Sequence, residues 1–426
     1  MNDERVNLGD VCEITSSTRI FANEYRNEGI PFFRSKEIIE LGNGATDVTD
    51  KYYISKERFN EIKKEKNIPQ KGDIFLSAIG ANLGEAFINN LEYEFYFKDG
   101  NIIWFRNFDT NRILSKYIYY WMKSKDFERQ YNNFSIGAAQ KALTIDSLKK
   151  YKIPILDIEK QQKIVKVLSE IDQKIINNSH INNNLEEFMK ILYQRWFIEF
   201  DFPNEDGKPY KSSGGILVYN EELKQEIPEN WKVENCYKNS LYTIIKPGLK
   251  MFKTKNYLAT GNVDGNIIID GEWVKYDSRE SRANMQSLPN SIWFAKMKNS
   301  IKHITLPKKS EWFNEKYVLS TGFLGIKCND NSLSYLHSFI YSEYFEKVKD
   351  MLAHGATQEA INNEDLKAIK LIVPEKRILQ LFEESTKAII QNELDIIKEN
   401  QKLNSLKEYL LPLLMNGQIN IDDIEI

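Results

Sequence analysis

The sequence is poor in the residues that build disulfide frameworks and metal sites. Among 426 residues there are three cysteines and four histidines. The cysteines, Cys12, Cys236 and Cys328, are isolated and odd in number, which excludes a disulfide framework and indicates a reducing compartment. The histidines have no spacing typical of metal ligands, so surface or hydrogen-bonded histidines are expected rather than a zinc site.

The signatures of common catalytic sites are also missing. There is no GxxxxGK[ST] loop for nucleotide phosphates, and neither the glycine-rich turn nor the Asn-Pro-Pro-aromatic tetrapeptide of an adenosylmethionine-dependent base methylase is present. Asp201, Asp206 and Lys208 have the residue types of a nuclease site, but all three are crowded into one short segment. The chain is therefore predicted to be non-catalytic, with no metal site of its own.

Long hydrophobic runs are absent. No stretch approaches the roughly 18 apolar residues that span a bilayer. The N-terminal sequence MNDERVNLGD lacks the apolar core of a signal peptide. We therefore expect a cytoplasmic protein with no membrane partner.

An overall excess of positive charge is missing too, because 58 Lys+Arg face 61 Asp+Glu. This balance excludes a uniformly basic nucleic-acid coat. Locally the charge is uneven: residues 240–327 hold 14 basic and 7 acidic residues, residues 371–426 hold 6 and 10, and residues 1–135 hold 19 and 21. A basic segment beside an acidic one is expected if the first faces phosphates and the second faces protein or solvent, although a solvated lysine-rich face explains the cluster equally well.

What the sequence does contain is an internal repeat of roughly 200 residues. Gly137-Ala-Ala-Gln-Lys-Ala142 is echoed by Gly355-Ala-Thr-Gln-Glu-Ala360, and a Leu-Lys pair follows each at the same offset. Each copy continues through a β-rich stretch that ends near a proline into a long helical pattern. The repeat therefore predicts a mixed domain and a long helix, each present twice.

The two predicted helices carry apolar residues at heptad-like spacing. Such a narrow apolar seam is buried most readily against a second helix, and polar positions such as Asn178 and Asn182 would fix its register; packing of each helix on its own domain is the alternative. The seam consists of Ile164, Leu168, Ile171, Ile175, Leu185 and Leu192 in the first helix, and of Ile389, Ile396, Leu403 and Leu410 in the second.

The predicted fold class is α+β, with two mixed α/β domains separated by two long helices that pair as a coiled coil. A segment rich in Pro, Gly and Ser between the halves is interpreted as a linker. The predicted boundaries are 1–152 for the first domain, 153–200 for the first helix, 201–227 for the linker, 228–370 for the second domain, 371–416 for the second helix and 417–426 for a tail.

Several short motifs resemble those of the specificity (S) subunits of type I restriction–modification systems. Leu8-Gly-Asp-Val-Cys-Glu-Ile14, Ile30-Pro-Phe-Phe-Arg34, Lys71-Gly-Asp-Ile-Phe-Leu76 and Gly137-Ala-Ala-Gln140 look like parts of a target-recognition domain. The segment from Arg195 to Gly215, followed by Ile227-Pro-Glu-Asn-Trp231, closely resembles the family's junction between the first helix and the second recognition domain. The second domain departs from the pattern, because its opening lacks the Leu-Gly-Asp of the first.

The resemblance implies a DNA-sequence reader that is not itself an enzyme. In the family, each recognition domain reads one half of a bipartite target in double-stranded DNA. The two helices pair antiparallel, set the spacing between the half-sites and dock two methyltransferase (M) subunits, and restriction (R) subunits join the complex. S-adenosylmethionine, ATP and Mg²⁺ are then expected in the partner subunits, with no cofactor in this chain.

Two other interpretations remain open at this point. One is the specificity subunit of a related fused or orphan methylation system, and the other is a coiled-coil scaffold whose domains bind protein. A DNA reader predicts affinity for duplex DNA that falls steeply with salt, whereas a scaffold predicts none. The candidate DNA contacts are cationic or amide side chains near predicted turns and strand ends: Arg19, Arg34, Lys36, Asn82, Gln140, Lys141, Lys253, Lys255, Lys296, Lys298, Lys302 and Gln358.

Overall fold

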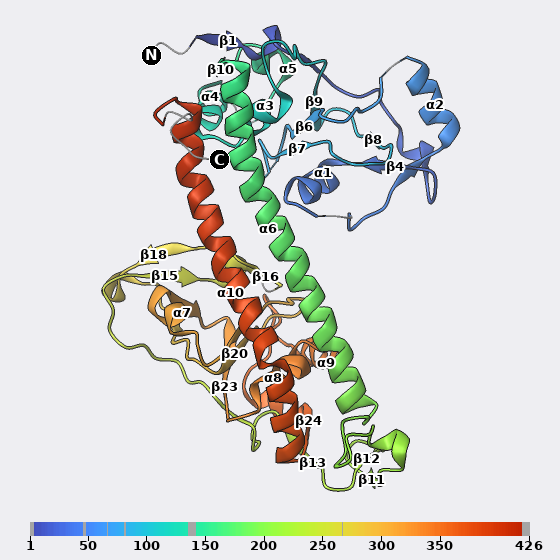
Figure 1. The fold of residues 1–426 in the computed structure, drawn as a ribbon, viewed down its shortest axis with the longest axis vertical. Helices are drawn as coiled ribbons and strands as arrows, with labels where there is room; N and C mark the ends of the chain where they lie inside the picture. The colour runs from blue at the N-terminus through green and yellow to red at the C-terminus, as the bar shows by residue number, and fades with distance from the viewer. Residues whose placement is uncertain are drawn as a thin grey trace. The chain divides into compact units, whose positions relative to one another are not determined.

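The computed structural model describes residues 4–45, 48–65, 67–80, 82–134, 142–265 and 267–419 (Figure 1). The chain divides into two compact units: one runs up to Ile176 and also includes the chain from Leu403 onward, and the other is Asn177–Lys402. Each unit contains a mixed α/β domain together with parts of the two longest helices, α6 (Ile158–Tyr193) and α10 (Lys376–Met415). The predicted fold class is thus confirmed.

The first domain is built on two four-stranded sheets. The antiparallel sheet has the order β2-β9-β6-β7, and the mixed sheet has the order β3-β5-β4-β8, in which β4 and β8 run parallel. A short pair, β1 with β10, joins the start of the domain to its end. The strands are β1 (Arg5–Asn7), β2 (Glu13–Thr15), β3 (Tyr25–Arg26), β4 (Ile30–Phe33), β5 (Tyr53–Ile54), β6 (Ile74–Ser77), β7 (Ala86–Ile88), β8 (Tyr96–Phe97), β9 (Ile102–Arg106) and β10 (Lys152–Pro154); the helices are α1 (Ser35–Gly42), α2 (Lys56–Lys64), α3 (Ser115–Met122), α4 (Lys125–Phe134) and α5 (Ile145–Leu148).

The second domain repeats this plan. Its antiparallel sheet has the order β14-β23-β20-β21, its mixed sheet the order β18-β15-β22-β19, and β13 pairs with β24 as β1 does with β10. The elements are β13 (Lys232–Asn235), β14 (Tyr242–Ile244), β15 (Lys255–Leu258), β16 (Val263–Asp264), β17 (Ile267–Ile268), β18 (Glu272–Val274), β19 (Ala283–Met285), β20 (Ser291–Ala295), β21 (His303–Leu306), β22 (Tyr317–Ser320), β23 (Phe323–Cys328), β24 (Lys370–Val373), α7 (Glu311–Lys316), α8 (Leu333–Ile340) and α9 (Glu343–Leu352).

The repeat seen in the sequence is a repeat of structure. Ile79 bridges Ala142 in the first domain, and Met297 bridges Ala360 in the second, so both partners of the second bridge lie 218 residues after those of the first. The same shift of 218 relates the first residues of α3 and α8, of α4 and α9, and of α6 and α10. The predicted duplication is confirmed, and the two GAxQxA motifs end in equivalent bridges.

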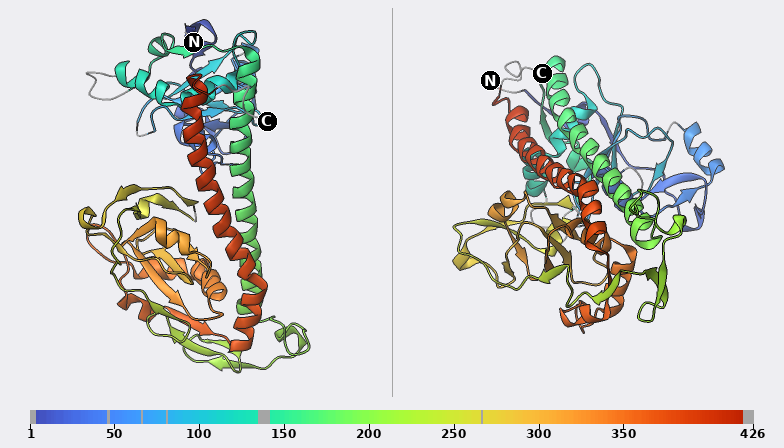
Figure 2. Two further views of the ribbon diagram at one scale, coloured as in Figure 1. Left: turned by 60° about the vertical axis from the view of Figure 1, so that its left-hand side comes forward. Right: turned by 60° about the horizontal axis from the view of Figure 1, so that its bottom comes forward.

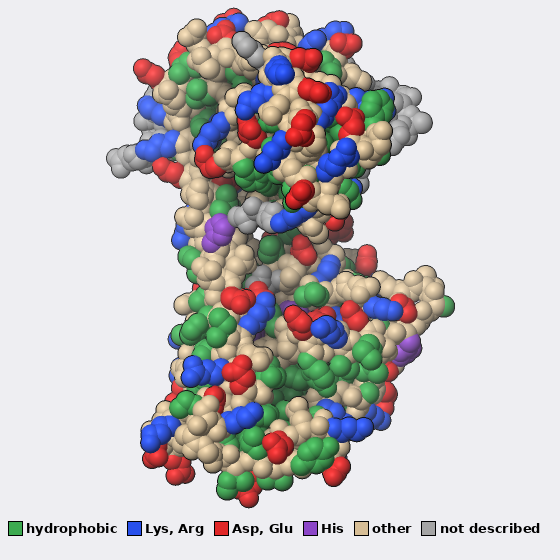
Figure 3. Space-filling model, turned by 90° about the vertical axis from the view of Figure 1, so that its right-hand side faces the viewer, with side chains coloured by type: hydrophobic (Ala, Val, Ile, Leu, Met, Phe, Trp, Pro, Cys, Tyr) green, Lys and Arg blue, Asp and Glu red, His purple; other side chains and the backbone are tan. Residues whose placement is uncertain are grey.

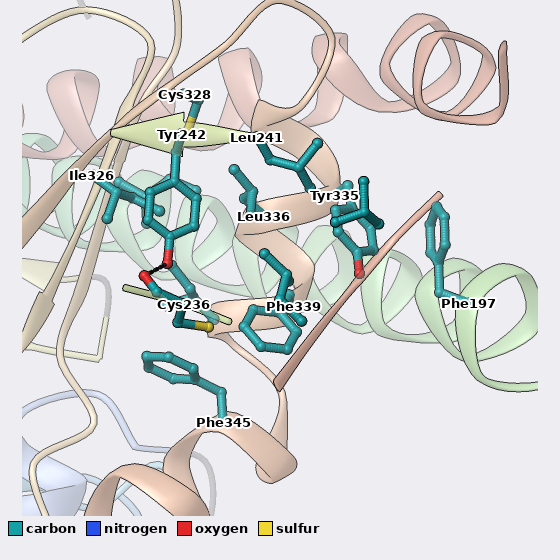
Figure 4. Close-up of a cluster of buried hydrophobic side chains, with 14 of the residues drawn as sticks. Phe197, Cys236, Leu241, Tyr242, Ile326, Cys328, Tyr335, Leu336, Phe339 and Phe345 are labelled. Atoms are coloured by element: carbon teal, nitrogen blue, oxygen red, sulfur yellow. Dashed lines mark hydrogen bonds between the residues drawn. The ribbon is translucent and has the colours of Figure 1, made fainter. Parts of the chain in front are cut away.

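Each domain is held together by a core of large aromatic and aliphatic side chains. In the first, the apolar run of β6 is buried on both faces, and the Trp104 ring stacks on Phe75 at a centroid distance of 6.2 Å. In the second, α8 and α9 pack on the antiparallel sheet, and the Tyr242 hydroxyl donates to the Cys236 carbonyl oxygen at 2.5 Å (Figure 4). All three cysteines are buried and free.

The segment 201–227 is not the free linker predicted from its composition. Phe202 stacks between Tyr210, at 4.6 Å, and Trp231, at 5.0 Å, within the core of the second unit. The remainder forms a hairpin of β11 (Leu217–Asn220) and β12 (Gln225–Pro228). Burial of these aromatic rings outweighs the turn-forming composition, so the segment folds as part of the second unit.

Helices α6 and α10 lie side by side and run antiparallel where they meet in each unit (Figure 2). In the first unit, Lys407 forms an ion pair with Asp172. In the second unit, the Asn178 side chain donates to Glu399 Oε2 at 2.7 Å and to Asn400 Oδ1 at 2.8 Å. The pairing predicted from the two seams is confirmed, with a buried polar contact at Asn178.

The seam itself is confirmed for α6 and only partly for α10. The deeply buried positions of α6 include Ile164, Leu168 and Ile171, and the other three predicted positions are half-buried. In α10 the predicted positions, Ile389, Ile396, Leu403 and Leu410, are all only half-buried. The buried face of its first half instead comprises Ile378, Phe382, Thr386, Ile390 and Leu394, since the second domain packs its core against that face. Packing on the domain and pairing between helices thus occur together.

Candidate nucleic-acid interface

Arg19 and Asn82 are the exposed candidates of the first domain. The Arg19 side chain is 71% exposed, its guanidinium lies 5.4 Å from the Phe21 ring centroid, and its Nε is 3.8 Å from Asp99 Oδ2. Phe21 is itself 58% exposed. Asn82 lies exposed in the loop between β6 and β7. Both side chains can reach a ligand without breaking a close internal contact.

Arg34 and Lys36 are instead engaged in a cluster of ion pairs at the start of α1. Arg34 donates to the fully buried Glu37 at 2.7 Å and to Asp50 at 3.1 Å, and it stacks over Tyr52 at 4.1 Å. Its hydrogen bond with Glu37 raises the pKa of the guanidinium above its usual range. Lys36 donates to Asp50 at 3.0 Å. These cations hold α1 against the segment that follows it, a structural role that the sequence pattern did not reveal.

Gln140 and Lys141 lie outside the described residues, whereas their counterparts in the second domain are described. There, the structure brings three candidates together. The Lys298 amide donates to the Glu359 carbonyl oxygen at 3.0 Å, the Ile361 amide donates to the Lys296 carbonyl oxygen at 3.0 Å, and Gln358 Nε2 donates to Met297 Sδ at 2.6 Å. Lys296, Lys298 and Gln358 therefore form one cluster, here called the β20 loop cluster, just beyond the end of β20.

The other lysine candidates of the second domain do not join this cluster. Lys255 is 9% exposed and its ammonium donates to the Asn314 carbonyl oxygen, so it is a buried structural residue rather than an accessible DNA contact. Burial lowers the pKa of Lys255. Lys302 donates to the Thr260 carbonyl oxygen at 2.7 Å, whereas Lys253 is exposed.

The electrostatics of the basic segment differ from its residue count. Many of its cations are satisfied within the chain, as in the pairs Lys298–Glu359, Lys308–Asp330 and Lys316–Asp270. Basic and acidic side chains are interspersed on the face of the molecule shown in Figure 3. Only particular unpaired cations, rather than the whole segment, are therefore available to an anionic ligand.

The histidines of the second domain are buried and have hydrogen-bonding partners. His303 Nε2 lies 2.8 Å from Glu346 Oε1, and His337 Nδ1 lies 2.9 Å from Thr305 Oγ1. Burial, together with His303, lowers the pKa of His337 to about 3. Among the described residues no cluster of three or more His, Cys, Asp or Glu side chains could hold a metal ion. Within the same ranges, none of the helices is sufficiently long and apolar to cross a bilayer.

A pocket of about 370 Å³ beside the β20 loop cluster went unnoticed in the sequence. Lys296 lines it together with Thr321, Asn363 and Glu364, and Phe323 and Met285 are among its apolar walls. These residues are spread over almost 80 positions of the chain and share no local motif. Only the shift of 218, which pairs Lys296 with Ala78, could have marked this lysine as a feature of one domain alone.

Comparison with known proteins is consistent with this architecture. A family model described as the type I restriction modification DNA specificity domain matches residues 2–187. The chain is 27% identical, over 98% of its length and 93% of the relative's, to the type I restriction enzyme MjaIX specificity subunit of Methanocaldococcus jannaschii. It is 33% identical to the putative type I restriction enzyme specificity subunit S.HindORF215P of Haemophilus influenzae, over 39% of this chain and 40% of that one.

A solved structure has a similar fold. The crystal structure of the type I restriction–modification S subunit from M. genitalium matches with a TM-score of 0.54 at 12% sequence identity. The match covers 96% of this chain and 95% of that one. The shared fold therefore includes both mixed domains and both long helices.

Proposed function

Because this chain belongs to the DNA specificity subunits of type I restriction–modification systems, we propose that each of its two mixed domains reads one half of a bipartite DNA target. The observation that carries this proposal is the structural repeat: two domains of the same plan, related by a shift of 218 residues, each continue into a long helix. Two linked readers add their discrimination, since mismatch costs of about 1–3 kcal/mol per base pair sum at separated positions.

The paired helices are proposed to fix the spacing between the half-sites and to dock two methyltransferase subunits. On α6, Ile181, Phe188 and Ile191 are 46%, 50% and 57% exposed. Their separations of seven and three residues place them on one face of the helix. An exposed apolar stripe of this kind is typical of a protein-binding surface and suits the methyltransferase subunit.

The chemistry of the complex is assigned to its partners. The family is non-catalytic, and we propose that S-adenosylmethionine, ATP and Mg²⁺ act in the methyltransferase and restriction (R) subunits, with the assembled complex in the cytoplasm.

Methylome sequencing of cells that express this chain with its methyltransferase partner tests the proposed function. The expected result is a bipartite motif with methylated adenine. Replacing residues 228–370 with the corresponding domain of another specificity subunit should change one half of the motif and leave the other half and the spacing intact. A continuous motif, or a change in both halves, contradicts the assignment of one domain to each half-site.

A further inference from the structure

Lys296 is an unusual cation of the second domain because it is half-buried and has no counter-ion. In the described part of the chain its ammonium has neither a hydrogen-bond nor an ion-pair partner, whereas Lys298, two residues later, is neutralised by Glu359 at 2.8 Å. Burial lowers the pKa of Lys296 with no opposing contribution from a carboxylate. Keeping a cation partly out of water without a partner costs free energy, which a ligand that supplies oxygen acceptors would offset.

The backbone around this lysine is held on both sides. The Lys296 amide donates to the Gly322 carbonyl oxygen at 3.0 Å, and its carbonyl oxygen accepts from the Ile361 amide at 3.0 Å. The neighbouring turn is ordered by Asn362, whose side-chain oxygen accepts from the Glu364 amide at 2.7 Å and whose own amide donates to Asp365 at 2.7 Å. The pocket is therefore pre-organised rather than assembled on binding.

Two further polar groups of the pocket lack partners within the described residues. These are the Thr321 hydroxyl and the exposed Asn363 side-chain amide. Glu364 also lines the pocket, but its carboxylate is held by Lys367 and hydrogen-bonded by Tyr237, and these contacts lower its pKa. The free groups of the pocket are thus one cation, one amide and one hydroxyl.

We propose that this pocket of the second domain, formed by Lys296, Thr321 and Asn363, binds a backbone phosphate of the target DNA. Lysine, threonine and asparagine are common phosphate-contacting residues. A recessed site suits a phosphate better than a base edge, because phosphates protrude from a duplex while base edges lie on the groove floor. Its volume of about 370 Å³ leaves room for the adjoining sugar. The inference rests on the proposed function and adds a phosphate site that positions the second domain.

The first domain has no equivalent cation. The shift of 218 residues places Ala78, which is 1% exposed, at the position of Lys296. The phosphate site is consequently specific to the half of the target that the second domain reads, and removing it should leave the first domain unaffected.

The test is a salt titration of DNA binding by the complex of this chain with its methyltransferase partner, comparing Lys296→Met with Lys298→Met. Each phosphate contact contributes about 0.9 to the slope of log affinity against log salt concentration. We expect Lys296→Met to lower the magnitude of this slope by about 0.9 and to weaken cognate and non-cognate DNA equally. Lys298→Met is the matched control, because its ammonium is already neutralised, and should leave the slope unchanged.

Three outcomes overturn the inference. An unchanged slope for Lys296→Met excludes the phosphate contact. Weaker binding of cognate DNA alone, at an unchanged slope, assigns Lys296 to base reading. Loss of complex assembly before DNA is added assigns the pocket to an acidic group of a protein partner. Absence of salt-dependent DNA binding in the unmodified complex would instead refute the proposed function itself, so the two failures are distinguishable.

Discussion

The buried contact of Asn178 between the two long helices predicts a measurable loss of stability when it is removed. Asn178 is 1% exposed and donates to Glu399 at 2.7 Å and to Asn400 at 2.8 Å. Replacing it with alanine takes one donor from the Glu399 carboxylate and another from the Asn400 amide oxygen. Removing one partner of a buried polar contact costs about 1–3 kcal/mol, with the upper end applying when a charged group is involved.

The matched control is Asn183→Ala, because Asn183 lies on the same helix and is exposed. Both variants gain the same small helix propensity of alanine, so their difference isolates the buried contact. For a unit of this size, about 2–4 °C of melting temperature corresponds to each kcal/mol, and thermal unfolding should place Asn178→Ala roughly 2–12 °C below Asn183→Ala. Equal melting temperatures would refute the stabilising role of this contact.

Two further predictions concern the second unit. Glu393 is 6% exposed, and burial raises its pKa to about 8, so its contribution to stability is present below pH 4.5 and is lost as the pH rises to 8. Glu393→Gln, which stays neutral, should flatten this decline in urea unfolding between pH 5 and 8; a decline as steep as in the unmodified chain contradicts the prediction. Phe202→Ala should cost about 3–5 kcal/mol, because its ring is buried against Trp231, whereas the exposed Glu205→Ala should cost less than 0.5 kcal/mol. Equal unfolding midpoints would show that the 201–227 segment is a passive linker.

The family and its duplicated plan could be predicted from the sequence because they depend on short local patterns. The GAxQxA motifs and the heptad-like spacing are readable wherever they occur, and the 218-residue shift of the structure agrees with them. The seam of α6 was predicted well for the same reason. The seam of α10 was predicted less well, since a periodic stripe shows that a helix is amphipathic without showing which face the domain covers.

The candidate DNA contacts were less predictable, because the availability of a cation depends on what the fold places beside it. Arg34 meets Asp50 across 16 residues, and Lys255 meets Asn314 across 59. Neither partner is visible in a local window of sequence. The 201–227 segment shows the same limitation: its Pro, Gly and Ser content is typical of a linker, yet its aromatic residues pack against Trp231.

By itself, the sequence determined the class of protein, the two mixed domains and the presence of two amphipathic helices that need partners, since these follow from composition, periodicity and repetition along the chain. The tertiary structure decided which charges remain free, and it singled out Lys296 from a segment of 14 basic residues. The physical reason is that charge is a property of each residue, whereas neutralisation and burial are properties of residues brought together by folding.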